Sequence, residues 1–371
     1  MAERTFYQIM VAGTDISSTI APILISLTTT DKSGRSSDTA SIEIDDTGGQ
    51  VVMPETGAEI EIVLGDAGGQ SDTVFMGKVD EVRSKGSGSG GRTMTISAKS
   101  ADSKGKAKQP QSRHMDNKTL EEALREAGQD AGITDIRVDQ QLRSIRRDWW
   151  GLDAESFINF GERIAREVGG TFKIRGNSAV MARRNSGQTA GGQALSSVTA
   201  MGGVNLIDWD ISPKLGRNTY RETTARFYDR QAGRWRDVRV QVPTEGGQAQ
   251  STSRHTAASE DQARGQANND SAKADRNKGG GSVTINGNVA AKPEGTCIVI
   301  GARPGIDGAY RIESVEHSVS ASGGFTTKLE LKQPQGGAGT DRRGSGGPGS
   351  SSGGSSSGLI GTAAAPGLAV Q

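Results

Sequence analysis

The chain has 371 residues, of which 33% are hydrophobic and only 4% aromatic, so any apolar core depends on aliphatic side chains. Its 44 basic and 43 acidic residues give a net charge of +1, which provides no global attraction for nucleic acid or an anionic membrane. The single cysteine, Cys297, excludes an internal disulfide and a cysteine-based metal site, and is expected to be a buried structural thiol. No apolar run approaches the ~18 residues of a membrane span and no secretory signal opens the chain, so we expect assembly in a cytoplasm.

Residues 1–105 show short runs in which apolar and polar side chains alternate. This period of two is typical of strands with one buried side, and at least six such runs predict a small barrel or sandwich. We expect a bulge at Gly77 in one of them. The side chains expected to share buried faces are Ile23, Ile25 and Leu27; Ala40, Ile42 and Ile44; and Ile60, Ile62 and Leu64.

Residues 106–184 change to a helical period after a polar, basic connector at 106–116. Thr119-x-x-Glu122 predicts a capping box at the start of one helix. Asp153 is the expected cap of a second helix, which Gly169 and Gly170 should end. A hairpin with its turn at 176–177 follows, so this region is predicted to be an α/β module. The apolar stripe of the second helix is Phe157, Phe160, Ile164 and Val168.

The remaining chain is predicted to contain a linker, a second β region and a tail. Residues 185–203 form the Gly- and Ser-rich linker, and residues 204–334 form the second β region. Within it we expect a polar helix at about 256–277, which lacks large apolar side chains and should pack weakly or only against a partner. Residues 335–371 are a Gly/Ser-rich tail that cannot bury enough apolar surface to offset its ordering entropy, and we expect it to be flexible. The fold class is therefore mainly β, with two β regions flanking a helix-plus-sheet module.

Motifs for chemistry are weak throughout, so we predict no catalytic residue, no cofactor and no metal site. The G-x-G-x-x-G match at 86–91 is followed by a strand rather than a helix, which indicates a hairpin loop. The three histidines, His114, His255 and His317, lack metal-ligand spacing, and no G-x-S-x-G elbow is present. The carboxylate pairs that could suggest a glycosidase are Asp45/Asp46, Glu59/Glu61 and Glu121/Glu122; each also fits a strand face or a helix start.

The strongest charge feature is residues 217–239, which hold seven arginines interleaved with aromatic side chains. Such a pattern is compatible with single-strand nucleic-acid binding or with a hairpin whose arginines meet acids on a neighbouring subunit. The neutrality of the whole chain favours the subunit interface. The candidate interface residues are Arg226, Arg230, Arg234, Trp235, Arg236 and Arg239.

Several stretches, in the same order, resemble the phage late control D proteins. Residues 37–46, 54–60 and 75–82 are similar to the opening domain of that family; residues 118–120, 155–157 and 169–172 to its α/β insert; and residues 308–317 and 323–331 to its end. Each stretch alone is weakly specific, but together they span nearly everything up to about residue 333.

The resemblance implies a baseplate hub of a contractile phage tail or a related injection system. In that family two β-barrels per chain associate as a homotrimer, whose pseudo-sixfold ring adapts the sixfold tail tube to the threefold spike. The implied partners are further copies of the chain, the tail spike protein, the tail tube protein and baseplate wedge proteins, in the baseplate of a virion tail. The apolar end of the tail suggests a tether to the spike or to the tape-measure protein. Two alternatives stay open: a peptidoglycan hydrolase of the injection tip, and a nucleic-acid-binding module.

Overall fold

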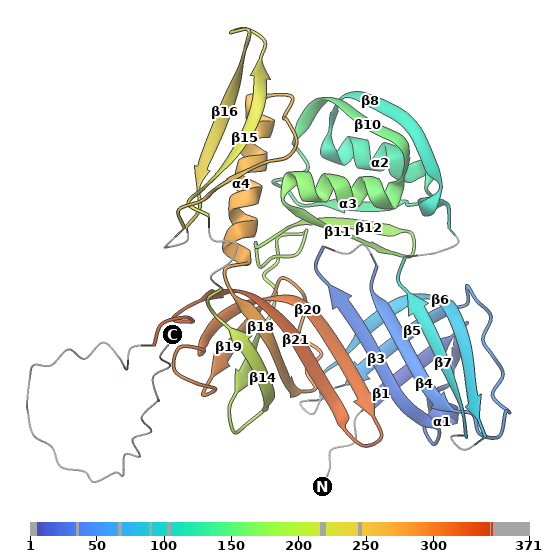
Figure 1. The fold of residues 1–371 in the computed structure, drawn as a ribbon. Coiled ribbons are helices and arrows are strands. Elements are labelled where there is room, and N and C mark those ends of the chain that lie inside the picture. The colour runs from blue at the N-terminus through green and yellow to red at the C-terminus, as the bar shows by residue number, and fades with distance from the viewer. Residues whose placement is uncertain are drawn as a thin grey trace, which may run out of the picture. The chain divides into compact units, whose positions relative to one another are not determined.

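The computed structural model describes residues 6–34, 37–65, 69–88, 91–101, 105–215, 220–243, 247–341 and 343. Strands dominate these residues, and one continuous 13-stranded sheet joins the first and last parts of the chain (Figure 1). The predicted mainly β class with an α/β insert is confirmed. Residues 344–371 of the predicted tail lie outside the described residues.

The first β region contributes seven strands and one short helix. Its strands are hydrogen-bonded in the order β3-β4-β7-β6-β5-β1-β2, and the side chains that alternate along them, such as Ile42, Ile62 and Met94, form one apolar core. The elements are β1 (Phe6–Val11), β2 (Thr14–Asp15), α1 (Ser17–Ile20), β3 (Leu24–Lys32), β4 (Thr39–Asp45), β5 (Glu59–Gly65), β6 (Ser71–Ser87) and β7 (Gly91–Lys99). The residues around the G-x-G-x-x-G match lie at the β6–β7 hairpin, as predicted.

Two details of this region differ from the predictions. Ile25 is 39% exposed, whereas Leu24 is buried, because the pairing of β3 with β4 shifts register between Leu24 and Ser26. The pairing of β6 with β5 shifts register between Ile62 and Val63 of β5, and its pairing with β7 shifts between Val79 and Glu81 of β6. Neither irregularity is at Gly77. Gly77 instead allows close packing, since a Cβ there would lie 2.2 Å from the carbonyl oxygen of Lys99.

The α/β module places two helices over a three-stranded sheet of order β11-β12-β9, with a separate two-stranded ribbon of β8 and β10. The capping box of Thr119 and Glu122 is present, and Gly169, with φ 73°, ends the second helix as predicted. The elements are η1 (Lys106–Lys108), β8 (Pro110–Thr119), α2 (Leu120–Asp130), β9 (Asp135–Val138), β10 (Arg146–Ser156), α3 (Phe157–Val168), β11 (Gly170–Arg175) and β12 (Ser178–Arg183).

Two predictions for this module were wrong. The residues expected to be a connector contain most of β8, whose polar side chains largely face solvent and gave no alternating apolar signal apart from Met115. The second helix is capped by Ser156, whose side chain accepts a hydrogen bond from the Asn159 N–H, and not by Asp153, which lies in β10. A capping side chain must directly precede the first helical turn, and only Ser156 does so.

The second β region pairs with the first through β20 and β3, over Ser314–Ser320 and Ser26–Lys32. Its core is a separate cluster that includes Val198, Cys297 and Tyr310. The strand β13 lies inside the predicted linker and pairs in parallel with β19, so only the first part of that segment is a connection. The elements are β13 (Ser197–Met201), β14 (Leu206–Ser212), β18 (Gly280–Asn286), β19 (Thr296–Ile300), β20 (Gly308–Ser320) and β21 (Gly324–Gln335). The closure of each region into a barrel, and the domain boundaries, stay predictions.

Residues 220–243 and 247–276 form a projection that we call the arm, inserted between the paired strands β14 and β18 (Figure 1). It contains β15 (Glu222–Asp229), β16 (Arg234–Gln241), β17 (Gln250–Thr252) and α4 (Glu260–Arg276). Its three strands form their own sheet, of order β16-β15-β17, rather than part of the second β region as predicted. The insertion is invisible in the sequence because β14 and β18, which pair with each other, lie on either side of the arm in the chain.

The helix α4 was expected to pack weakly or only against a partner; it packs on the hairpin of its own chain. Its buried alanines, Ala263 and Ala267, let the helix backbone approach the hairpin closely, where they meet Ala225 and Phe227. The hydroxyl of Thr223 donates to the Ala267 carbonyl at 2.7 Å. Small residues thus replace large apolar ones as the means of packing.

Candidate interaction surfaces

The hairpin of the arm has two different faces. Cross-strand partners share a face, so the pairs Phe227/Arg236 and Ala225/Val238 lie toward α4. The pairs Tyr228/Trp235 and Arg226/Asp237 and the residue Arg239 lie on the opposite, outward face. The structure therefore divides the six predicted interface residues: Arg226, Trp235 and Arg239 face outward, Arg234 and Arg236 lie on the α4 side, and Arg230 lies in the turn.

Two of the arginines are neutralised within the arm. Arg226 Nε lies 2.8 Å from an Asp237 carboxylate oxygen, and Arg236 lies 3.0 Å from Asp229 and 5.8 Å from the centre of the Phe227 ring. The hydrogen bond from Arg226 lowers the pKa of Asp237, and the backbone N–H of Ala232, followed by Arg236, lowers the pKa of Asp229. Both acids are therefore ionised at neutral pH and cancel local positive charge.

The other arginines of the hairpin keep their charge. Within the described part of the chain, Arg230, Arg234 and Arg239 form no ion pair, so the arm presents an excess of positive charge. Arg217 lies outside the described residues. Beside these arginines, Tyr228 and Trp235 are 44% and 55% exposed and contact each other edge to face, with ring centres 5.3 Å apart. Exposed aromatic residues next to arginine are typical of protein interfaces.

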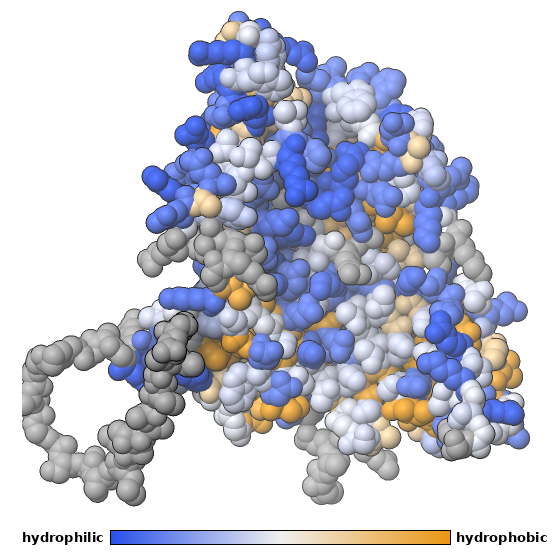
Figure 2. All heavy atoms as spheres, viewed as in Figure 1, coloured by the Kyte–Doolittle hydropathy of each residue, from blue (hydrophilic) through white to orange (hydrophobic). Residues whose placement is uncertain are grey.

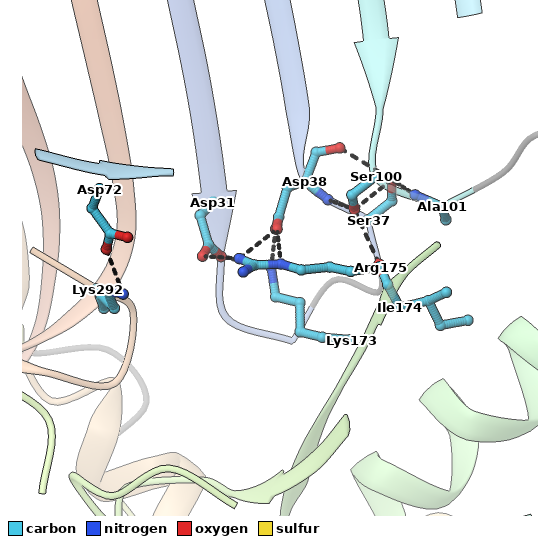
Figure 3. Close-up of polar contacts among 10 residues, drawn as sticks. All are labelled: Asp31, Ser37, Asp38, Asp72, Ser100, Ala101, Lys173, Ile174, Arg175 and Lys292. Carbon is cyan, nitrogen blue, oxygen red and sulfur yellow. Dashed lines mark hydrogen bonds and ion pairs between the residues drawn. The ribbon is translucent and has the colours of Figure 1, made fainter. Parts of the chain in front are cut away.

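A second polar cluster joins the first β region to the α/β module. Lys173 and Arg175 on β11 reach the carboxylates of Asp31 and Asp38 at the tip of the β3–β4 hairpin (Figure 3). The carboxylate of Asp38 is only 3% exposed, and its pKa is raised first by burial and then by the neighbouring Asp31. The Ser100 hydroxyl adds a hydrogen bond to the Ile174 carbonyl. We call Asp31, Asp38, Lys173 and Arg175 the charged junction.

Sequence reasoning missed this junction. Lys173 and Arg175 alternate with buried Phe172 and Ile174, which shows only that they point away from the core of the module. Their partners lie more than 130 positions earlier, so no local pattern connects them. A related contact between the two β regions, from Lys292 to Asp72 at 2.8 Å, also appears in Figure 3.

A cleft of about 740 Å³ lies beside the charged junction and is lined by both the first β region and the α/β module. Glu59 and Glu61, one of the carboxylate pairs weighed for catalysis, line it together with Met10 and Met76. Glu61 accepts a hydrogen bond from the Thr73 hydroxyl.

The surface drawn in Figure 2 is largely hydrophilic over the arm and the α/β module, whereas apolar residues gather over the β regions.

The other carboxylate pairs have local structural roles. Asp45 accepts hydrogen bonds from the side chain and backbone of Thr47, and Glu122 caps α2; these bonds lower the pKa of both groups. A general acid requires a raised pKa, so neither is suited to that role. Glu121 pairs with Arg125 at 2.8 Å, and Asp46 accepts from the Val51 N–H.

The remaining residues singled out in the sequence are dispersed. His317 is buried and contacts the Thr327 hydroxyl at 3.0 Å, as expected of a packing residue, while His114 is exposed near Asp116. Cys297 is fully buried, and burial raises its pKa to about 12. Across the described ranges, no three His, Cys, Asp or Glu side chains gather as metal ligands. No helix in the part of the chain that the structure describes is both long and apolar enough to span a membrane.

Comparisons with known proteins support the resemblance stated from the sequence. The chain is 30% identical over 195 residues to the probable baseplate hub protein of Escherichia phage P2, covering 52% of this chain and 49% of that protein. It is 29% identical over 185 residues to the probable baseplate hub protein of Escherichia phage 186, covering 50% of this chain and 46% of that protein. The chain thus spans about half the length of the curated relatives it matches. No family model matches the sequence.

The fold itself is shared with a solved tail protein. The tail protein from Neisseria meningitidis MC58 superposes with a TM-score of 0.67 at 15% identity, over 89% of this chain and 96% of that one. The resemblance to phage baseplate hub proteins is therefore confirmed at the level of homologues and fold.

Proposed function

We propose that this chain, a relative of phage baseplate hub proteins, is a structural hub of a phage tail or related injection system. In this proposal three copies form a ring of pseudo-sixfold symmetry that joins a sixfold tail tube to a threefold spike. The hub works by geometry rather than by turnover. It would be assembled in the host cytoplasm and function in the baseplate of the virion.

The observation that carries the proposal is the single sheet that connects the two β regions. Seven backbone pairs between β3 and β20 hold the two regions side by side in one chain. Each region has its own apolar core, formed by side chains of its own strands. Three such chains would place six similar β units around one axis while keeping three copies of the α/β module and of the arm.

The partners of this hub would follow the two symmetries. The tail tube protein would meet the six β units, and the tail spike would meet a threefold face, with baseplate wedge proteins at the periphery. The predicted interface residues of the arm, Arg226 to Arg239, would contact a neighbouring subunit. The tail beyond residue 335 would tether the spike or the tape-measure protein; deleting residues 344–371 without weakening hub–spike binding would contradict that role.

The mass of the purified chain in solution tests the proposal. Light scattering on a sizing column should show a species near three times 38.7 kDa, alone or with the spike protein. A chain that stays monomeric under both conditions would contradict the trimeric ring.

The alternative function is a peptidoglycan hydrolase, whose candidate site is the cleft beside the charged junction. Release of soluble fragments from labelled cell walls, abolished by Glu59→Gln together with Glu61→Gln, would support the hydrolase. We expect no release above a boiled control, because both carboxylates come from the same face of one strand, whereas a glycosidase needs two that flank the scissile bond.

A further inference from the structure

The outer strand of the arm has an open edge. Among the described residues, β16 pairs only with β15, so the backbone N–H and C=O groups along its other edge have no strand partner. Its first three residues are Arg234, Trp235 and Arg236. An open edge of this kind is a template for a further strand.

A second open edge belongs to β14, at the end of the 13-stranded sheet. Within the described ranges β14 pairs with β18, and its other side has a single bridge, from Leu206 to Gly202. Asp208, Trp209 and Asp210 follow, all exposed, with Trp209 43% exposed. Asp208 accepts a hydrogen bond from the Thr284 hydroxyl, and no ion pair within the described chain neutralises either acid.

These two edges carry opposite charges on either side of a tryptophan. One presents Arg-Trp-Arg and the other presents Asp-Trp-Asp, at consecutive positions of a strand. In an antiparallel pair with Trp235 opposite Trp209, Arg234 lies opposite Asp210. Arg236, which also pairs with Asp229 within the arm, lies opposite Asp208. Because side chains alternate between faces, both ion pairs would share one face and the tryptophan pair would lie on the other.

We infer that β16 of one copy adds to the edge of β14 of the next copy. The contact has to be between copies, since within one chain the hairpin of the arm and β14 extend in opposite directions from the base of the arm (Figure 1). It uses two different surfaces, so it is heterologous and closes into a ring when the rotation between copies allows. The inference rests on the proposed oligomeric hub and names the acids that the arm contacts in it.

Two other roles for the arm, protection against aggregation and nucleic-acid binding, explain fewer of the arm's features than pairing with β14 does. Charged residues on an edge strand can simply prevent aggregation, but an exposed tryptophan in the middle of each charged triplet works against that purpose. In nucleic-acid binding, bases would stack on aromatic faces, and the edge-to-face contact between Tyr228 and Trp235 covers part of that surface. The ionised Asp229 and Asp237 beside the arginines would also repel phosphates.

A charge exchange tests the pairing by the mass of the complex. Asp208→Lys with Asp210→Lys should raise the dissociation constant between copies roughly tenfold or more, because like charges then face each other. Arg234→Glu with Arg236→Glu should do the same, and the four substitutions together should restore the trimer. A trimer that is unaffected by either pair of substitutions would overturn this inference while leaving the hub proposal intact.

Disulfide trapping gives a measurement that leaves all charges unchanged, which matters because Arg236 also stabilises the arm. Directly opposite residues of paired strands lie within disulfide reach, and the native Cys297 is buried and unreactive. The variant with Trp209→Cys and Trp235→Cys should give covalent multimers on oxidation. A mixture of the two single variants should give only dimers.

The matched control replaces another exposed tryptophan, Trp149→Cys, together with Trp209→Cys. This control should give no multimers. If the variant with Trp209→Cys and Trp235→Cys is trimeric by mass but forms no intermolecular disulfide, the strand pairing alone is rejected. An unsubstituted chain that is not trimeric would reject the hub ring as well. Binding of a dT20 oligonucleotide that is lost with Arg234→Glu and Arg236→Glu but kept with Asp208→Lys and Asp210→Lys would reassign the arm to nucleic acid.

Discussion

Arg276, in the last turn of α4, connects the arm to the second β region through a nearly buried set of charges. Its guanidinium lies 3.0 Å from Glu294 and 2.6 Å from Glu313, and its side chain is only 5% exposed. Glu294 also accepts hydrogen bonds from the Ser33 hydroxyl and the Asn185 N–H. Arg276 and Glu294 together thus link the arm to residues from distant parts of the sequence.

We predict that Arg276→Met lowers the free energy of unfolding by roughly 3–5 kcal/mol, because it leaves the buried Glu294 without its partner. Urea denaturation followed by circular dichroism would measure the loss. Arg226→Met is the control, since it removes an exposed ion pair and should leave the urea midpoint unchanged. Equal effects of the two substitutions would contradict the role given to Arg276.

His317 lies where the two β regions meet, opposite Thr29 of β3 and Thr327 of β21. Burial lowers its pKa to about 4, so the folded protein keeps this imidazole neutral in a range where the unfolded chain, with a pKa of about 6.5, is protonated. The unfolded state then binds more protons, and the contribution of this residue to stability falls as the pH falls from about 6.5 to about 4.

Replacing this side chain should therefore flatten the acid dependence of stability. His317→Gln keeps a group that can hydrogen-bond to Thr327 and should remove a loss of at most about 3 kcal/mol between pH 6.5 and pH 4. Unfolding free energies measured across that range would show the difference. His114→Gln, at an exposed histidine, should retain the wild-type slope; an unchanged slope in His317→Gln would refute the assignment.

At the scale of elements, two helical glycines have opposite surroundings. A Cβ on Gly161 of α3 would lie 2.3 Å from the ring of Phe172, which is itself packed edge to face on Phe157. A Cβ on Gly265 of α4 would meet nothing within 4 Å. The first glycine is needed for close packing of a helix on a sheet, and the second only weakens its helix.

Alanine at these two positions should change stability in opposite directions. Gly161→Ala should destabilise by about 1–3 kcal/mol, since the phenylalanine must move. Gly265→Ala should stabilise by about 0.5–1 kcal/mol through helix propensity alone. Thermal melting of the two variants side by side measures both, and the same sign for both would show that packing against Phe172 does not control α3.

For the whole molecule, the charged junction is where the first β region and the α/β module meet through side chains. It joins two separate apolar cores by ion pairs rather than by a shared apolar contact. A polar interface of this kind contributes less stability than an apolar core. Because ion pairs hold the junction, its stability depends on each of the four charges. The nearly enclosed Asp38 is the most dependent of the four.

Lys173→Met should destabilise the protein by roughly 3–5 kcal/mol at pH 7, because Asp38 loses a partner while buried. The pKa of Asp38 is already raised in the folded state, so this carboxylate becomes protonated at a higher pH in the folded protein than in the unfolded chain. The loss of stability caused by Lys173→Met should therefore shrink as the pH is lowered. Adding Asp38→Asn should recover part of the loss. Urea midpoints at pH 7 and pH 5 would test this, and a deficit that grows at pH 5 would contradict it.

The sequence by itself determined the features that depend on neighbouring residues. Alternation along β4, β5 and β7 set the strands and their buried faces, and Thr119 and Gly169 marked the ends of helices, because capping and periodicity act over a few residues. The arginine-rich hairpin was also predictable, since its turn and both of its strands are contiguous. The resemblance to hub proteins likewise required only short stretches in order.

Only the tertiary structure decided which strands and charges meet. Backbone hydrogen bonding is the same for every strand, so nothing local specifies that β20 joins β3, that β13 joins β19, or that the arm forms a separate sheet. The bulge that turns Ile25 outward, the partners of Lys173 and the close packing of α4 through alanines depend on surfaces brought together from distant positions. For the same reason the two open edges at β14 and β16 can be recognised only from the complete strand pairing in the folded structure.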